Sequence, residues 1–212
     1  MSTLQKIILA FLVMFGLVTN SMAAQKSGCI LAQKGKVTAA WMAYKTPLKK
    51  GVSGVFDSVK YTAVAAKGKN FREILVGSSV VIDTTSVNSK NKGRDAKLVK
   101  FFFKQMNSTT INAKIVDIKA DKRIKGKPRT GVVTLDITMN GVRKKVPMKY
   151  TFADSVFAAK GVIDVFDFSA NIALASINKA CFDLHQGKTW NDVTIAFTTH
   201  IEATLCHAKP LK

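Results

Sequence analysis

Most of the sequence after residue 35 alternates apolar and polar residues with a period of two, which is the pattern of half-buried β-strands. The predicted strands are residues 36–45, 52–67, 78–87, 109–119, 131–139, 142–153, 157–168 and 193–205. The dipeptide Asn140-Gly141 separates the fifth strand from the sixth, and it predicts a tight hairpin with a type I′ turn. The pattern therefore predicts an all-β chain of eight strands.

Three segments have apolar residues at helical spacing instead. Residues 70–76 predict a single turn capped by Asn70, because an Asn side chain can accept from the free amides of a first turn. Residues 94–106 predict a second helix, with Asp95 in its first turn. Residues 171–185 predict a third helix, which Gly187 would stop.

Eight sequential strands joined by short turns predict a closed antiparallel barrel or a sandwich. Closure removes unpaired strand edges, and the interior of an eight-stranded barrel is filled by side chains or holds one small ligand. Lysines are scattered along the strands, which argues against an outer-membrane barrel with its apolar outward band.

The N-terminus has the pattern of an export signal. Lys6 precedes an unbroken apolar run at residues 7–18, and Ser21 and Ala23 are the small residues that precede a cleavage site. We expect residues 1–23 to be a signal peptide, residues 24–212 to be the mature domain, and the periplasm to be its location. An uncleaved anchor is the alternative, whereas Lys26 argues against a lipoprotein signal.

The charge is strongly basic, with 33 Lys and Arg against 13 Asp and Glu and a formal net charge of +20. Such a balance usually indicates nucleic-acid binding. Chromosomal DNA is not present in the periplasm, so we expect no nucleic-acid partner for an exported protein. Anionic lipid headgroups remain, and the charge predicts peripheral contact with an anionic membrane. General solubility without a specific partner is the alternative reading.

No motif for catalysis, a cofactor or a metal ion stands out. Residues 187–189 (Gly-Lys-Thr) resemble the end of a phosphate-binding loop but lack its first glycine. Asp164 and Asp167 more simply pair with lysine or cap a turn than act as an acid and base. His185 and His200 leave a hydrolase as a minor hypothesis. We therefore predict a protein that is not an enzyme.

A set of segments resembles a known family. The set comprises residues 37–56, Ile82-Asp83-Thr84, Arg94-Asp95 with Leu98, Phe101-Phe102, and residues 131–146. Together they resemble the YceI-like family of periplasmic, lipocalin-like lipid-binding proteins, over residues 36–203. The resemblance implies an eight-stranded antiparallel barrel and often a homodimer. It also implies an elongated pocket for a polyisoprenoid, an isoprenoid quinone or a fatty-acid-like amphiphile.

The sequence departs from the family pattern in places. Lys36-Val37 and Lys45 stand where histidines are usual, and residues 180–193 and the three cysteines indicate a divergent branch. In the closed barrel that the resemblance implies, the first and last strands are neighbours. We therefore expect a disulfide between Cys29 and Cys206, which leaves Cys181 free.

These observations predict a periplasmic protein that carries or stores an amphiphilic lipid in its barrel. The candidates for the pocket lining are Trp41, Phe56, Met139, Tyr150, Phe152 and Phe166. Lys45 and Arg94 are candidates for headgroup binding, although a salt bridge with Asp95 or Asp83 is the simpler interpretation of Arg94. The alternative function is a ligand-free structural or stress-related interaction protein of the cell envelope. If the inward-facing positions of a strand are shifted by one residue, all of its predicted lining side chains point out of the pocket.

Overall fold

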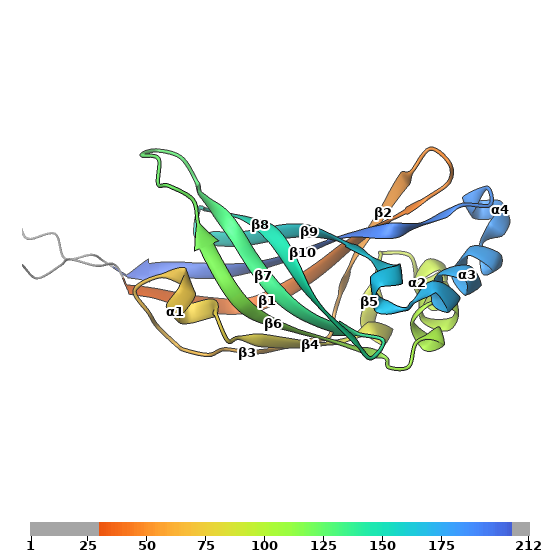
Figure 1. Ribbon diagram of the computed structural model, residues 1–212, viewed down its shortest axis with the longest axis horizontal. Helices are drawn as coiled ribbons and strands as arrows, with labels where there is room; N and C mark the ends of the chain where they lie inside the picture. The colour runs from red at the N-terminus through yellow and green to blue at the C-terminus, as the bar shows by residue number, and fades with distance from the viewer. Residues whose placement is uncertain (1–29, 205–212) are drawn as a thin grey trace, which may run out of the picture.

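The computed structural model describes residues 30–204, which form one antiparallel sheet of ten strands curled around an apolar interior (Figure 1). The strands are β1 (Ile30–Lys45), β2 (Lys50–Phe56), β3 (Val59–Thr62), β4 (Ser79–Asp83), β5 (Val87–Asn88), β6 (Thr110–Ala120), β7 (Arg129–Met139), β8 (Val142–Ala153), β9 (Val156–Asp164) and β10 (Thr189–Thr204). Their order across the sheet is β3-β4-β6-β7-β8-β9-β10-β1-β2-β5. The all-β class and the curled antiparallel sheet are confirmed. The signal peptide, its cleavage site, Cys29 and Cys206 lie outside the described residues.

The number of strands differs from the prediction because two predicted strands are interrupted. The segment 52–67 gives β2 and β3, which a bend at Asp57 and Ser58 separates. The segment 78–87 gives β4 and β5, with the 3-10 turn η1 (Thr84–Ser86) between them. The Asp83 carboxylate causes this turn, because it accepts from the amide of Thr85 at 2.9 Å and from its hydroxyl at 2.7 Å. These bonds also lower the pKa of Asp83.

The sheet joins the two ends of the described chain. β1 pairs with β10 from Ile30 opposite Thr204 to Lys45 opposite Thr189, and β1 pairs with β2 along its other edge. The β1–β10 ladder shifts register between Lys34 and Thr38, next to Gly35 with a φ of 68°. Such a bulge lets a 16-residue strand bend around the interior.

The hairpin between β7 and β8 confirms the predicted turn. Asn140 has a φ of 53° and Gly141 a φ of 78°, the positive pair that a type I′ turn needs. The buried Asn140 side chain also accepts from the amide of Asn107 at 2.7 Å and donates to the carbonyl of Phe168 at 3.0 Å. This one side chain therefore connects three loops at the same end of the sheet.

Short helices cover the two ends of the curled sheet (Figure 1). They are α1 (Phe71–Leu75), α2 (Lys92–Phe101), α3 (Asn171–Ala180) and α4 (Phe182–His185), and the further 3-10 turns are η2 (Phe103–Gln105) and η3 (Val165–Phe168). Helix α1 lies at one end, and α2, α3 and α4 gather at the other. The Asn70 cap of α1 is confirmed, because its side chain accepts from the amide of Glu73 at 3.0 Å. Between residues 30 and 204, every helix is too short or too polar to span a bilayer.

Candidate functional site

An elongated apolar cavity runs along the inside of the curled sheet. Its inner part, of about 120 Å³, lies between the strands. Its outer part, of about 440 Å³, lies between the sheet and helices α2, α3 and α4. The residues that line both parts are Trp41, Phe56, Ile111, Met139, Ile163 and Ile195. The two parts therefore adjoin each other along this shared wall.

Strand alternation produces the wall. On β7, Leu135, Ile137 and Met139 point inward at every second position, and Met148 from β8 lines the same space. On β10, Val193 and Ile195 continue the apolar surface toward the helices. Alternation of this kind puts one face of each strand into the interior. The wall therefore follows directly from the period-two pattern of the sequence.

An aromatic cluster closes the cavity at the end that α1 covers. Phe71 from α1 packs edge to face against Tyr150, Phe152 and Phe157, with ring centroids 4.9–6.0 Å apart. Phe157 also stacks on Phe197, whose side chain lines the inner cavity. Offset and edge-to-face packing of this kind adds to the stability that ring burial provides. The cavity is therefore blind at this end.

Two buried hydrogen-bond donors of the inner cavity have no partner among the described residues. They are the indole Nε1 of Trp41 and the hydroxyl of Tyr61, and both side chains line the inner cavity. A buried polar group without a partner costs stability, roughly 1–3 kcal/mol. Both atoms are shielded from solvent, so an acceptor atom of a ligand would reach them only after a movement of the neighbouring side chains.

Basic side chains line the outer part of the cavity at the helical end. Lys45 comes from β1, and Arg94 and Lys97 come from one face of α2. Arg94 donates from Nε to the hydroxyl of Ser89 and from Nη2 to its carbonyl, both at 2.7 Å. Within residues 30–204, Lys45, Arg94 and Lys97 have no carboxylate within ion-pair distance. This rim therefore favours a negatively charged group.

His185 lies among these cations at the end of α4. Its Nδ1 is 2.7 Å from the hydroxyl of Thr189, which itself donates to the side-chain oxygen of Asn178 at 2.8 Å. Because that hydroxyl proton is used, Nδ1 is the donor to Thr189, and Nε2 is left as an acceptor in the neutral ring. Burial lowers the pKa of His185, and nearby Lys45 and Lys97 lower it further.

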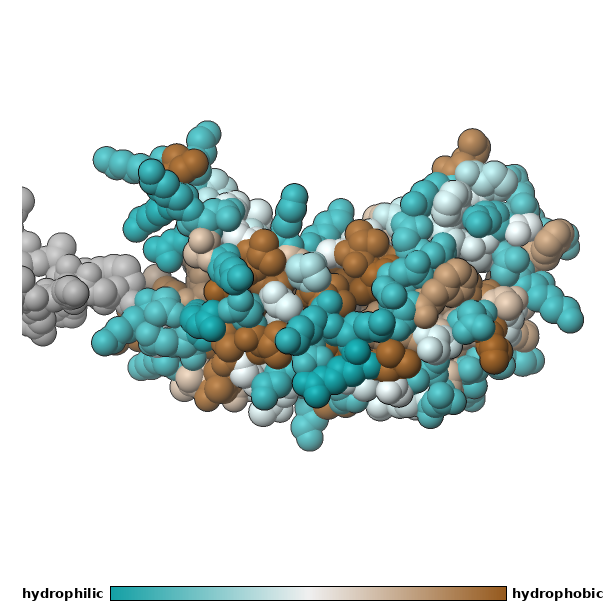
Figure 2. Space-filling view, viewed as in Figure 1, coloured by the Kyte–Doolittle hydropathy of each residue, from teal (hydrophilic) through white to brown (hydrophobic). Residues whose placement is uncertain are grey.

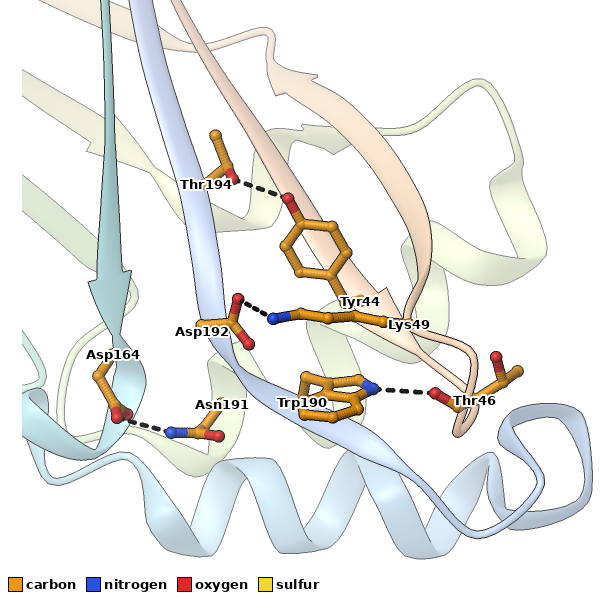
Figure 3. A network of polar contacts seen from close by, with 8 residues as sticks. All are labelled: Tyr44, Thr46, Lys49, Asp164, Trp190, Asn191, Asp192 and Thr194. Atoms are coloured by element: carbon orange, nitrogen blue, oxygen red, sulfur yellow. Dashed lines mark hydrogen bonds and ion pairs between the residues drawn. The ribbon is translucent and has the colours of Figure 1, made fainter. Parts of the chain in front are cut away.

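A polar network holds the strand ends next to this rim (Figure 3). The Trp190 indole donates to the carbonyl of Thr46 at 2.9 Å, and the Lys49 ammonium lies 2.8 Å from an Asp192 carboxylate oxygen. Lys49 also lies over the Trp190 ring, 4.8 Å from its centroid. These contacts connect the β1–β2 turn to the start of β10 beside the rim.

Comparison with known proteins gives the chain its family. A model of the YceI-like domain matches residues 31–201. The chain belongs to the YceI-like family. No curated protein sequence matches it.

Solved structures share the YceI-like fold. A polyisoprenoid-binding domain from Saccharophagus degradans, implicated in plant cell wall breakdown, is 13% identical with a TM-score of 0.55, and the match covers 84% of this chain and 99% of that one. A mutant of the Campylobacter jejuni YceI protein is 18% identical with a TM-score of 0.50, over 74% of this chain and 86% of that one. At these identities the likeness shows the fold alone.

The YceI-like fold places five of the eight predicted site residues at the cavity. Trp41, Phe56 and Met139 line both parts, and Lys45 and Arg94 line the outer part. Arg94 makes its bonds to Ser89, while the Asp95 carboxylate accepts from the Ser89 amide at 3.0 Å. The predicted pairing of Arg94 with Asp95 or Asp83 is therefore not the arrangement that this fold contains.

The other three predicted lining residues lie elsewhere. Tyr150 and Phe152 belong to the aromatic cluster beyond the inner cavity, and burial raises the pKa of the Tyr150 hydroxyl. Phe166 is 51% exposed in η3. The predicted seventh strand ends at Asp164, whose carboxylate accepts from the Phe166 amide at 2.8 Å. The 3-10 turn thus breaks the alternation from which Phe166 was assigned to the interior.

Several cavity residues were not in the predicted site. Tyr61, Lys97 and Trp190 line it together with Leu98 and Phe102 from the α2 region. Helical spacing could have identified Lys97, because this residue lies one turn after Arg94 on the same face of the predicted helix.

The remaining motifs have structural roles. Asp164 caps η3 and accepts from the side chain of Asn191 at 2.6 Å, and Asp167 lies 3.9 Å from the Lys144 ammonium. Gly187 and Lys188 lie in the loop between α4 and β10, and Thr189 is the first residue of β10.

Proposed function

We propose that this YceI-like domain binds the apolar tail of an amphiphilic lipid in its cavity, with the polar head at the basic rim. The observation that carries the proposal is the shape and chemistry of the space. It is long, blind at the aromatic end, apolar along its walls and lined by unpaired cations at its helical end. An amphiphile matches this arrangement, because it has an apolar tail at one end and a polar head at the other.

The energetics support a single-chain ligand. Burying ten methylenes contributes about 8 kcal/mol at about 0.8 kcal/mol each. Ordering the chain and losing its translational freedom offset part of this gain. The remainder is sufficient for useful affinity without any reaction, so the proposed role is binding, transport or storage.

Two further observations support the ligand class. One similar structure is a polyisoprenoid-binding domain, which favours a polyisoprenoid or an isoprenoid quinone. The free donors of Trp41 and Tyr61 favour a ligand that carries an oxygen acceptor, as quinones and fatty amides do. The export pattern of residues 1–23 leads us to propose the periplasm as the location of this activity. The homodimer stays a prediction, which analytical ultracentrifugation can check.

The test is lipid analysis of the protein purified from its own host. We expect native mass spectrometry and solvent extraction to find a co-purifying amphiphile. Ala113 lines the inner cavity, and Ala120 is exposed on the same strand. Ala113→Leu should therefore reduce lipid loading, whereas Ala120→Leu should leave it unchanged. A reproducible absence of lipid, with no uptake of quinones or fatty amides, would overturn the proposal in favour of a ligand-free role.

A further inference from the structure

Two hairpins project from the same side of the molecule, one near each end of its long axis (Figure 1). One is the turn between β1 and β2, and the other is the loop that connects β6 to β7. Each has a large aliphatic side chain in solvent, because Leu48 is 91% exposed and Ile124 is 65% exposed. Among the large hydrophobic residues that are exposed in the described part of the chain, Leu48 has the largest exposed fraction.

Basic residues are neighbours of both aliphatic residues in the sequence, although the Lys49 ammonium is paired with Asp192 and the Arg129 guanidinium lies over the Phe71 ring. In the sequence, Lys49 and Lys50 directly follow Leu48, and the residues around Ile124 are Lys122, Arg123, Lys125, Lys127 and Arg129. All of these are exposed. In Figure 2 hydrophobic atoms lie among hydrophilic ones on the β6–β7 projection and form the outermost point of the β1–β2 projection. The two tips thus share one composition, an apolar centre with a basic margin.

The tips are held in place by contacts at their bases. The Thr46 amide donates to the carbonyl of Lys188 at 2.9 Å, and the Trp190 and Lys49 contacts secure the same turn (Figure 3). In the other loop, Asp121 and Thr130 bond to each other twice, through their backbones at 3.0 Å and their side chains at 2.7 Å. The exposure of Leu48 therefore belongs to a fixed turn, and little order has to be gained when it makes contact.

We propose that these two tips dock the protein on a bilayer surface that contains anionic lipids. Such a surface offers negative headgroups to Lys and Arg and an apolar layer just beneath them for Leu48 and Ile124. A nucleic acid offers the phosphates but no such layer, and residues 46–50 and 121–129 contain no aromatic side chain on which a base could stack.

Docking in this way has a consequence for the cavity. The β1–β2 tip continues directly into Tyr44 and Lys45, which line the outer part of the cavity. Contact of Leu48 with the headgroup layer therefore brings the basic rim close to the membrane. The docking surface itself consists of side chains outside the cavity, so this proposal is tested without a bound ligand.

The experiment is co-sedimentation with vesicles of phosphatidylcholine alone or mixed with phosphatidylglycerol, using the same purified form of the chain for every variant. We expect binding only to the mixed vesicles, and we expect salt to weaken it. Lys125→Glu with Lys127→Glu should lower the partition coefficient at least about tenfold. Leu48→Ser with Ile124→Ser should lower it roughly threefold to tenfold.

Matched controls separate docking from general charge attraction. Lys60→Glu with Lys104→Glu makes the same change of charge on exposed residues of β3 and η2, along the edge away from the tips (Figure 1). Val81→Ser replaces an exposed aliphatic residue of β4 on that edge. We expect both controls to bind like the unaltered protein.

Three results would overturn the proposal. One is equal loss of binding in the tip and control charge variants, which would indicate attraction by net charge alone. Another is vesicle binding that does not change when Leu48 and Ile124 are replaced. The third is full competition by a DNA duplex for vesicle binding, together with DNA binding that does not change when Leu48 and Ile124 are replaced. Circular dichroism verifies that every variant is folded.

Discussion

Trp41 lies directly opposite Gly54 in the β1–β2 ladder, and its indole occupies the space that a side chain at position 54 would need. A Cβ atom there would lie 2.6 Å from Cζ2 of Trp41 and 2.6 Å from the carbonyl oxygen of Asn88. The glycine thus permits the indole to line the cavity.

Gly54→Ala should therefore destabilise the protein, by roughly 1–3 kcal/mol for an overpacked contact with little room to relax. Urea unfolding followed by tryptophan fluorescence measures this change. Gly51→Ala is the matched control on the same strand, because its nearest atom is the flexible Met42 sulfur at 3.1 Å. Equal effects of the two substitutions would contradict the close packing of Trp41 on β2.

Tyr61→Phe and Trp41→Phe should change ligand selectivity. Each removes a buried donor that has no partner among the described residues. We expect Tyr61→Phe to leave the stability of the empty protein unchanged or to raise it by up to about 1 kcal/mol. Its affinity for a quinone should fall roughly fivefold to tenfold, while its affinity for a hydrocarbon tail of equal length should not fall. Fluorescence titration measures both affinities, and equal losses for the two ligands would argue against the donor role.

The stability of the protein should fall in mildly acidic solution because of His185. Its folded pKa is lowered by burial and by two lysines, so the unfolded chain takes up the proton first. The destabilisation is absent above the unfolded pKa of about 6.5 and is complete below the folded pKa. Urea unfolding between about pH 5 and 8 should show this decline, and His185→Gln should weaken it. An NMR titration that gave His185 a pKa above its ordinary value would refute the assignment.

The cysteines lead to the prediction of a disulfide bond between Cys29 and Cys206. Ile30 pairs with Thr204, so the described ends of β1 and β10 are neighbours, as a bridge between Cys29 and Cys206 requires. We expect peptide mapping without reductant to find that bridge. Cys181 is buried and lines the outer cavity, so its alkylation should be slow and a bound lipid should slow it further. A peptide that links Cys181 to Cys206 would refute the predicted pairing.

The sequence predicts local features well where one short-range interaction decides them. The Asn70 cap of α1 and the Asn140-Gly141 turn are confirmed, because each depends on neighbouring residues alone. The turn η1 was not predicted, although its cause is local: the Thr85 amide donates to the Asp83 carboxylate. Residues 78–87 are rich in β-branched residues and alternate like one strand, so the pattern alone does not reveal the turn between β4 and β5.

Strand alternation predicted part of the cavity lining. Trp41 and Met139 lie within long regular strands, and both line the cavity. Phe166 lies in the 3-10 turn η3, which ends the alternation, and its side chain is exposed. Lys97 and His185 come together at the outer part of the cavity from segments distant in sequence, and no periodicity specifies such a meeting. Tertiary packing alone determines it.

The position of β1 between β10 and β2 also bears on how the protein forms. Contacts between Ile30 and Thr204 join residues separated by almost the entire described chain. Loop closure over such a span is slow, because its entropy must be lost before any contact is gained. A chain released residue by residue, during synthesis or transport, cannot complete the middle of its sheet until the last strand emerges. Until then β1 and β9 each present an unpaired edge, so this interval is when the protein is most exposed to aggregation and proteolysis.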